Sequence, residues 1–192
     1  VEYLKYYAIS HVQEIFGYSD INRYIELVSE HNSFLIDSIL GDFISVSELK
    51  YIFCNLIRER VSVKDVVFIF EKINDFSDES TKADLLDKLR VALSRQICHT
   101  YANEEKQIFG YEVSEDIIKM LENNAEEEQG GVVKIDGSKF SKLKKELKQV
   151  FSEQKTVLIA PQHLRQLLFV LISQIYTDIP VLCLEEISPE FE

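Results

Sequence analysis

Apolar residues recur every three or four positions through the first hundred residues, the period of an α-helix that packs on one side. The clearest stripe consists of Leu49, Ile52, Phe53, Leu56 and Ile57. It follows Ser45 and Glu48, whose spacing is that of a capping box, in which each side chain satisfies a backbone amide of the other residue. The pattern therefore predicts a helix that begins just after Ser45.

Four further amphipathic helices are predicted around this one, and the short connections between them favour an antiparallel bundle. Two precede it, at 3–16 and 21–28, and are separated at Gly17. Two follow it, one after a start signal at 62–65 and one after Ser80. Their inward-facing positions are predicted to be Val66, Ile69, Phe70 and Ile73 in the first and Leu85, Leu86, Leu89, Leu93 and Ile97 in the second.

The pattern changes near Asn103 to short apolar runs that alternate with helical segments. Strands are predicted at 107–113, 132–135, 156–160 and 181–184, with helices after Ser114, after 136–138 and at Pro161, and a loop at 126–131. The run at 156–160 is continuously apolar, which is typical of a strand buried on both faces. Alternating strands and helices predict parallel pairing with right-handed crossovers. The predicted fold class is therefore α+β with several subdomains: an N-terminal helical bundle followed by a small α/β subdomain with a mostly parallel sheet.

Charge argues against nucleic acid as a partner. The formal net charge of the 192 residues is −12, whereas phosphate backbones select cationic surfaces. The charge is unevenly distributed, because the segment 130–155 carries seven lysines and three acids, while 112–128 carries seven acids and one lysine. Such blocks are usually solvated helix faces and less often docking surfaces for a partner of opposite charge.

Cysteine usage and hydropathy indicate an intracellular, water-soluble piece of a protein. Cys54, Cys98 and Cys183 are odd in number, widely spaced and surrounded by apolar residues, so we expect reduced core thiols. The longest apolar stretch, 164–176, is shorter than a membrane span and contains Arg165. The chain has no signal peptide and opens inside a predicted helix without Met, so we expect it to be a fragment of a longer protein.

No catalytic, cofactor or metal site is predicted. Neither glycine-rich phosphate-binding motif occurs, and the turn after the strand at 156–160 lacks the glycines that close phosphate approach requires. Cys98 and His99 are adjacent, so on a helix they point in different directions. The other histidines, His11, His31 and His163, lack ligand spacing, and Glu185 and Glu186 lack a partner group. We therefore expect that the chain is not an enzyme. Two alternatives remain: an α/β enzyme domain that binds a small molecule or nucleotide, and a stand-alone cytosolic helical adaptor.

Three segments, in order along the chain, resemble the type III secretion export gate family of flagella and virulence injectisomes. Residues 56–65 are similar to the family pattern Leu-Leu-x-Glu-x-Val-Ser-Ile-Arg-Asp, and 89–97 to Val-Arg-x-x-Leu-Gly-Arg-x-Ile. The segments 157–159, 164–165, 180–182 and 186–187 match its closing strand–helix–strand. Ser94 replaces a usual Gly, and Gly41 stands where Pro is common. The segments 97–99 and 101–103 resemble injectisome members more than flagellar ones.

The resemblance implies an intact protein with an N-terminal membrane part and a four-subdomain cytoplasmic part that forms a nonameric ring at the bacterial inner membrane. This chain would then comprise the end of a preceding subdomain (1–18), the helical third subdomain (19–102) and most of the fourth (103–192). In the family the third subdomain mediates ring contacts. The fourth helps to receive the stalk protein, the gatekeeper and chaperone–substrate complexes. Membrane contact would come only from a region outside this chain.

The segment 58–65 places both signs of charge on a turn between two helices, which suits the head-to-tail contacts of a ring. We expect the following residues to lie at or support that contact: Arg58, Glu59, Arg60, Lys64, Asp65, Arg90 and Arg95. An alternative, strongest for Arg90 and Arg95, is that several of them brace the bundle internally. For partner docking we expect Lys139, Lys142, Lys145 and Arg165.

Overall fold

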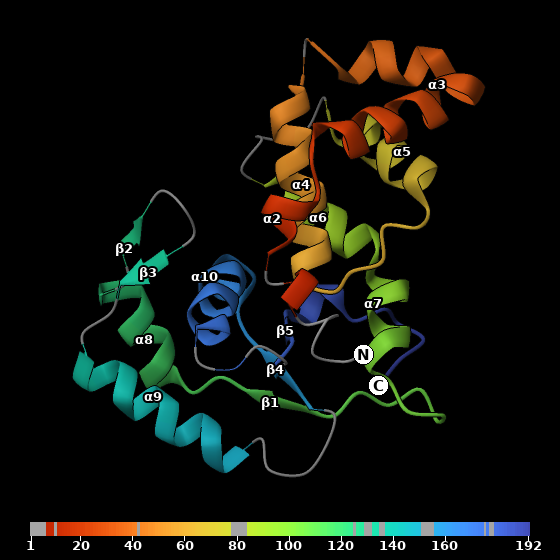
Figure 1. Ribbon diagram of the computed structural model, residues 1–192. Coiled ribbons are helices and arrows are strands. Elements are labelled where there is room, and N and C mark those ends of the chain that lie inside the picture. Colours follow the sequence, from red (N-terminus) through yellow and green to blue (C-terminus); the bar gives the residue numbers. More distant parts are fainter. Residues whose placement is uncertain are drawn as a thin grey trace. The chain divides into compact units, whose positions relative to one another are not determined.

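A computed structural model describes residues 7–9, 11–41, 43–77, 84–124, 126–128, 132–134, 137–150, 156–174, 176 and 179–192 (Figure 1). The chain divides into two compact units, 1–97 and 98–192, and the division falls within helix α7 (Ser94–Tyr101). The first unit is helical, and the second combines a small sheet with helices, as the sequence predicts.

The first unit confirms the predicted helical bundle. Its helices are α2 (Val12–Ile15), α3 (Tyr18–Ile39), α4 (Val46–Arg58), α5 (Val66–Phe76), α6 (Leu85–Ala92) and the start of α7. Helix α3 packs against α4 and α5, and α5 packs against α6. Three aromatic rings connect α3, α4 and α5. The centroid of the Phe53 ring lies 5.1 Å from that of the Tyr24 ring and 6.0 Å from that of the Phe70 ring.

Helix α4 forms as its sequence predicts. Glu48 N donates to Ser45 Oγ (3.2 Å), and Ser45 N donates to Glu48 Oε2 (2.8 Å), which completes the capping box. Four members of the predicted stripe are buried, namely Leu49, Ile52, Phe53 and Leu56. Burial of this face, rather than helix propensity alone, holds the helix in place.

Two predicted helix boundaries are wrong. The helix predicted at 21–28 extends to Ile39, with a break in helical geometry at Asn32 (φ −149°, ψ 63°). The helix predicted after Ser80 is two helices, because Leu93 leaves the helical region (φ −91°, ψ 8°) and ends α6. The predicted starts at 3–6 and 80–83 lie outside the described residues.

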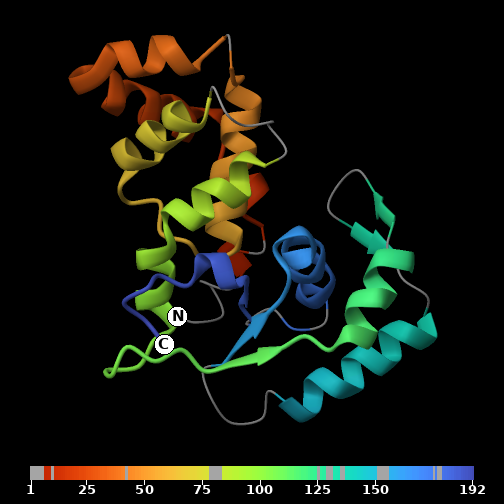
Figure 2. The same ribbon diagram turned by 180° about the vertical axis from the view of Figure 1, so that it is seen from behind.

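The second unit contains strands and helices in alternation. They are β1 (Gly110–Glu112), α8 (Glu115–Asn124), β2 (Glu126–Glu128), β3 (Val132–Lys134), α9 (Gly137–Val150), β4 (Val157–Ile159), α10 (Gln162–Ser173), β5 (Val181–Leu182) and a 3-10 turn, η1 (Leu184–Glu186). Strands β1, β4 and β5 form a parallel sheet in that order, with Tyr111 beside Leu158 and Leu158 beside Val181 (Figures 1 and 2). The central position of β4 explains its continuous apolar run, because helices and loops cover both faces of a central parallel strand.

One predicted loop is a strand. Glu126–Glu128 forms β2 and pairs antiparallel with β3, so that Glu127 lies opposite Val133. Consecutive glutamates are depleted in strands, and the pairing here comes from backbone contact with β3 instead. As a consequence β3 is not part of the parallel sheet.

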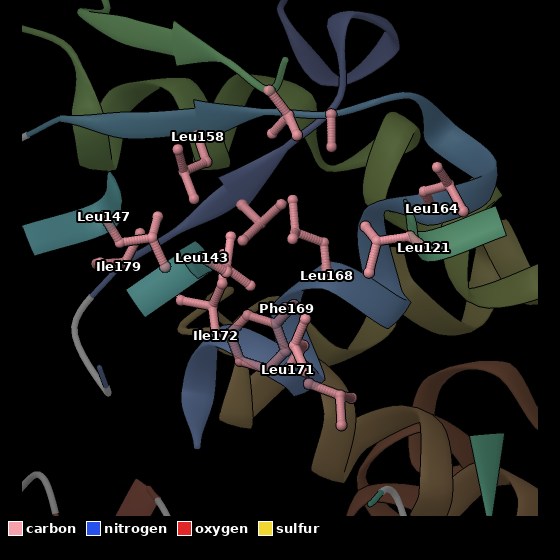
Figure 3. Packing of buried hydrophobic residues seen from close by; sticks show 14 residues of the cluster. Leu121, Leu143, Leu147, Leu158, Leu164, Leu168, Phe169, Leu171, Ile172 and Ile179 are labelled. Carbon is pink, nitrogen blue, oxygen red and sulfur yellow. The ribbon is translucent and has the colours of Figure 1, made fainter. Parts of the chain in front are cut away.

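Leucines from several elements form the core of the second unit. Leu143 and Leu147 of α9, Leu158 of β4, and Leu168 and Ile172 of α10 are each 5% exposed or less (Figure 3). The figure shows these side chains converging between the sheet and the two helices. The sheet is therefore covered on this face by α9 and α10.

The C-terminal residues run alongside the segment before β1. Glu192 N donates to Lys106 O (3.1 Å), and Ile108 N donates to Glu192 O (2.6 Å). The thiol of Cys98 donates to Glu186 O and accepts from Ser188 N, both at 3.3 Å. These bonds attach the chain end to the second unit.

Candidate functional site

The turn between α4 and α5, which carries most of the predicted interface residues, is a Schellman motif. Val61 N donates to Leu56 O (2.8 Å) and Arg60 N donates to Ile57 O (3.0 Å). Arg60 occupies the left-handed position with φ 60°, where glycine is usual, and its side chain is exposed. A residue with a Cβ atom is strained in this conformation, so Arg60 adds a backbone cost to the turn.

The end of the turn is fixed by Asp65. Its Oδ1 accepts from Phe68 N (3.2 Å), so Asp65 caps α5. Lys64 and Asp65 are both exposed. Arg60, Lys64 and Asp65 therefore bring both signs of charge to the surface of one turn, as the sequence predicts.

Glu59 and Arg90 lie inside the first unit. Arg90 Nη1 is 3.0 Å from Glu59 Oε2, and each side chain is only 2% exposed. This ion pair joins the C-terminal end of α4 to α6. A direct contact with another subunit would require exposed side chains, so the structure gives these two residues the internal bracing role that the sequence left as an alternative.

The remaining predicted interface residues differ in exposure. Arg58 is half-buried, and its Nη2 donates to Asn55 Oδ1 (3.0 Å) one turn earlier on α4. Arg95, on α7, is exposed. Arg58 is therefore held against its own helix, whereas Arg95 is available to solvent.

The predicted docking residues are not equivalent. Lys145 is exposed on α9, while the side chains of Lys139 and Lys142 lie outside the described residues. Arg165 is fully buried on α10, where its Nε is 3.3 Å from Glu186 Oε1, and Glu186 is 1% exposed. Arg165 therefore joins α10 to η1 and is not presented to a partner, contrary to the prediction.

Sequence reasoning missed an apolar groove in the second unit. The groove has a volume of about 140 Å³ and opens beside β1. Its lining is mostly apolar, and consists of Tyr111, Glu112, Val113, Ser114, Ile117, Leu143, Leu147, Leu158, Leu168 and Ile172. These residues come from five elements and loops far apart in sequence, so no single motif indicates the groove.

The cysteines are buried free thiols. Desolvation raises the pKa of the Cys54 and Cys98 thiols, and desolvation followed by the nearby Glu186 carboxylate raises the pKa of Cys183 to about 12. Because the thiolate is the nucleophile, a raised pKa lowers the fraction of each thiol in its reactive form at neutral pH.

Within the described part of the chain, no group of three or more His, Cys, Asp or Glu side chains could hold a metal ion. No helix there has both the length and the apolar character needed to cross a membrane. The two surface features described above are the charged turn between α4 and α5 and the groove beside β1.

Known proteins are similar to the chain over nearly its whole length. The flagellar biosynthesis protein FlhA of Bacillus subtilis is 25% identical over 189 residues, which cover 95% of this chain and 28% of that protein. Among solved structures with the same fold is Shigella flexneri MxiA, with a TM-score of 0.87 and 18% identity, which covers 98% of this chain and 63% of that one. Another is nonameric EPEC SctV-C, with a TM-score of 0.85 and 21% identity, which covers 98% of this chain and 59% of that one.

A third structure with the same fold is Chlamydia pneumoniae CdsV, solved in a complex of CdsV and CdsO (TM-score 0.87, 22% identity, 99% of this chain and 56% of that one). The chain spans less than two thirds of each of these proteins. The model of the FHIPEP family matches residues 1–192. The resemblance found in the sequence is thereby confirmed, and the chain belongs to the FHIPEP family, the export gate proteins of type III secretion.

Proposed function

We propose that the chain is a ring-forming and docking module of a type III secretion export gate, which takes part in the selection of substrates and chaperones for export. The observation that carries this proposal is the close fit of 98% of the chain to nonameric EPEC SctV-C, at a TM-score of 0.85. The intact protein is proposed to be anchored in the bacterial inner membrane by a part outside this chain, with this module at the cytoplasmic face.

We propose the same subdomains that the sequence predicts, namely 1–18, 19–102 and 103–192. The division of the structure within α7, close to the second boundary, supports this assignment. The helical unit is assigned to the ring contacts and the second unit to partner docking.

The ring contact is assigned to the exposed charges of the helical unit, namely Arg60, Lys64, Asp65 and Arg95. A closed ring uses a heterologous contact, in which two different surfaces meet, and a turn that carries both signs of charge can face an oppositely patterned edge. Arg58, Glu59 and Arg90 support the turn from inside. Exposed ion pairs contribute only about 0–1 kcal/mol each, so the ring depends on many repeated contacts and on membrane attachment.

The docking partners are proposed to be the stalk protein, the gatekeeper and chaperone–substrate complexes. The complex of CdsV with CdsO supports a partner from the secretion machinery. Lys139, Lys142 and Lys145 all belong to the lysine-rich helix α9, whose positive charge suits an acidic partner.

The injectisome branch of the family is proposed over the flagellar branch. The resemblance of 97–99 and 101–103 to injectisome members supports it, as do the fold matches to MxiA and SctV-C. The sequence relative from Bacillus subtilis is flagellar. Assignment to a gene neighbourhood of injectisome or flagellar components would decide between the two branches.

Sedimentation velocity over a wide concentration range tests the ring contact. The variant Lys64→Glu reverses an exposed charge of the turn, and Arg23→Glu makes the same change at an exposed site of α3 as a matched control. We expect the unmodified chain and Arg23→Glu to associate as concentration rises, and Lys64→Glu to remain smaller. Equal association of both variants, or a strict monomer at every concentration, would overturn the assignment of the contact to this turn.

A further inference from the structure

We infer that the open edge of β1 and the adjacent groove bind an extended segment of a partner protein, which adds to the sheet as a fourth strand. This segment inserts one large apolar side chain into the groove and carries Lys or Arg beside it. The inference deepens the proposed docking function and rests on it only for the identity of the partner. It concerns a surface separate from the charged turn.

The first observation is an unpaired strand edge. Val157 N donates to Phe109 O (3.0 Å), and Val113 N donates to Ile159 O (2.9 Å). Because alternate residues of a strand direct their backbone groups to opposite sides, Gly110 and Glu112 direct theirs away from β4. Among the described residues, no backbone group bonds to β1 on that side. Such an edge is a template on which another chain can form a strand.

The second observation is the groove on one face of this edge. Tyr111 lies in register with Leu158, and both line the groove together with Leu143, Leu147 and Leu168. A strand paired with β1 would place every second side chain on this same face. The volume of about 140 Å³ is close to that of an apolar protein cavity of about 150 Å³ that accepts benzene. One aromatic or large aliphatic side chain of the added strand therefore fits the groove.

The third observation is the charge along the edge. The segment 104–116 exposes five acids and contains one base; the acids are Glu104, Glu105, Glu112, Glu115 and Asp116. The base is Lys106, whose Nζ lies 3.7 Å from Oε2 of Glu190. A basic strand is attracted to this edge, whereas a second copy of the same acidic edge is repelled. The charge thus selects a different protein, with Lys or Arg beside its apolar residue, over self-association.

A designed probe tests the inference without the natural partner. The probe is a short acetylated, amidated peptide that alternates Lys with Val and has Phe at its centre. Binding is measured by fluorescence anisotropy at low salt, and backbone pairing by amide hydrogen exchange. We expect the peptide to slow exchange at Gly110 and Glu112, whose N–H groups face the open edge. Replacing Phe by Ala should weaken binding by about tenfold, because the groove then remains empty.

Two controls separate strand addition from simple charge attraction. A peptide of the same charge, N-methylated at alternate residues, cannot pair and should bind at least about tenfold more weakly. In the protein, Glu112→Pro removes an outward N–H that β4 does not use, and Glu112→Ala removes the same charge but keeps the N–H. We expect Glu112→Ala to weaken binding slightly through the lost charge and Glu112→Pro to abolish it, with both variants folded by circular dichroism.

Absence of peptide binding, equal binding of the N-methylated peptide, or equal affinities of the two Glu112 variants would each overturn strand addition. None of these outcomes affects the sedimentation test of ring assembly. Failure of the ring contact likewise leaves the peptide measurements interpretable, so the two proposals fail separately.

Discussion

Arg90 Nη1 lies 3.0 Å from Glu59 Oε2 within the helical unit, where water reaches only 2% of either side chain. A buried ion pair of this kind contributes little beyond a well-packed apolar pair, but removal of one partner leaves an uncompensated charge. The pair also lies at the end of α4, directly before the turn that presents Arg60 and Lys64. We therefore expect loss of the pair to disturb the turn to which the ring contact is assigned.

Breaking this pair should strongly destabilise the chain. We expect Arg90→Met to lower the free energy of unfolding by about 3–5 kcal/mol, and the double variant Glu59→Leu, Arg90→Met to lose much less than the sum of the two single changes. Urea denaturation of the four proteins gives the coupling energy. Lys64→Met, at an exposed site, serves as the control, with an expected change within about 0.5 kcal/mol. Equal effects of Arg90→Met and Lys64→Met would contradict burial of the pair.

The left-handed backbone at Arg60 should be relieved by glycine. Arg60 occupies the residue after the helix end in the Schellman motif with φ 60°, a conformation that a Cβ atom disfavours. We expect Arg60→Gly to be more stable than Arg60→Ala by about 1 kcal/mol, since both lack the arginine side chain and differ in strain. Thermal and urea unfolding of the two variants would measure the difference. A more stable Ala variant would show that the turn adopts another conformation in solution.

The capping box of α4 should contribute a measurable part of the stability of the helical unit. Ser45→Ala removes the acceptor for Glu48 N and should lower the free energy of unfolding by about 1 kcal/mol. Ser33→Ala, at an exposed site in α3, is the matched control and should be neutral or slightly stabilising. The comparison is made by urea denaturation, and similar losses in both variants would argue against the cap.

Gly110 should not tolerate a side chain. A Cβ atom at this position would lie 2.9 Å from Ile159 Cγ1 and 3.2 Å from Val157 Cγ2, so these side chains or β1 itself would have to shift. We expect Gly110→Ala to lower the free energy of unfolding by about 1–3 kcal/mol. At Gly137, where α9 begins, a Cβ atom meets nothing within 4 Å, so Gly137→Ala should be neutral or stabilising. Loss of stability in the Gly137 variant alone would reverse this expectation.

Alkaline pH should destabilise the second unit through Cys183. Its thiol pKa is about 12 in the folded chain, against an ordinary value of 9.0. Between these values the unfolded state has lost the proton and the folded state still holds it, so the free energy of unfolding falls as pH rises. The slope is at most about 1.4 kcal/mol per pH unit for one group. Urea unfolding between pH 8 and 11 should show a shallower fall for Cys183→Ala, and an unchanged slope would mean that the thiol titrates normally.

Local pattern alone was sufficient for the elements whose stability is local. The stripe of α4 and its capping box are determined by residues four or fewer apart, and both appear in the structure as predicted. The same holds for β4, whose uninterrupted apolar run indicates a strand covered on both faces. The family resemblance also rested on short segments in a fixed order, and the family match confirms it.

Tertiary structure decided the pairings between distant residues. Glu126–Glu128 became a strand because β3 lies beside it, whereas its side chains alone favour a loop. Glu59 and Arg90 were predicted to lie at or support the ring contact, with internal bracing as an alternative. Arg165 was predicted to dock a partner, and Glu186 was left without a partner group. In the structure each of the four is buried and lies beside an opposite charge from another element. The groove is formed by side chains that meet only when β1, β4 and three helices pack together. Burial of charged side chains and contacts between distant elements depend on the whole fold, and neither is indicated by the local pattern of apolar residues.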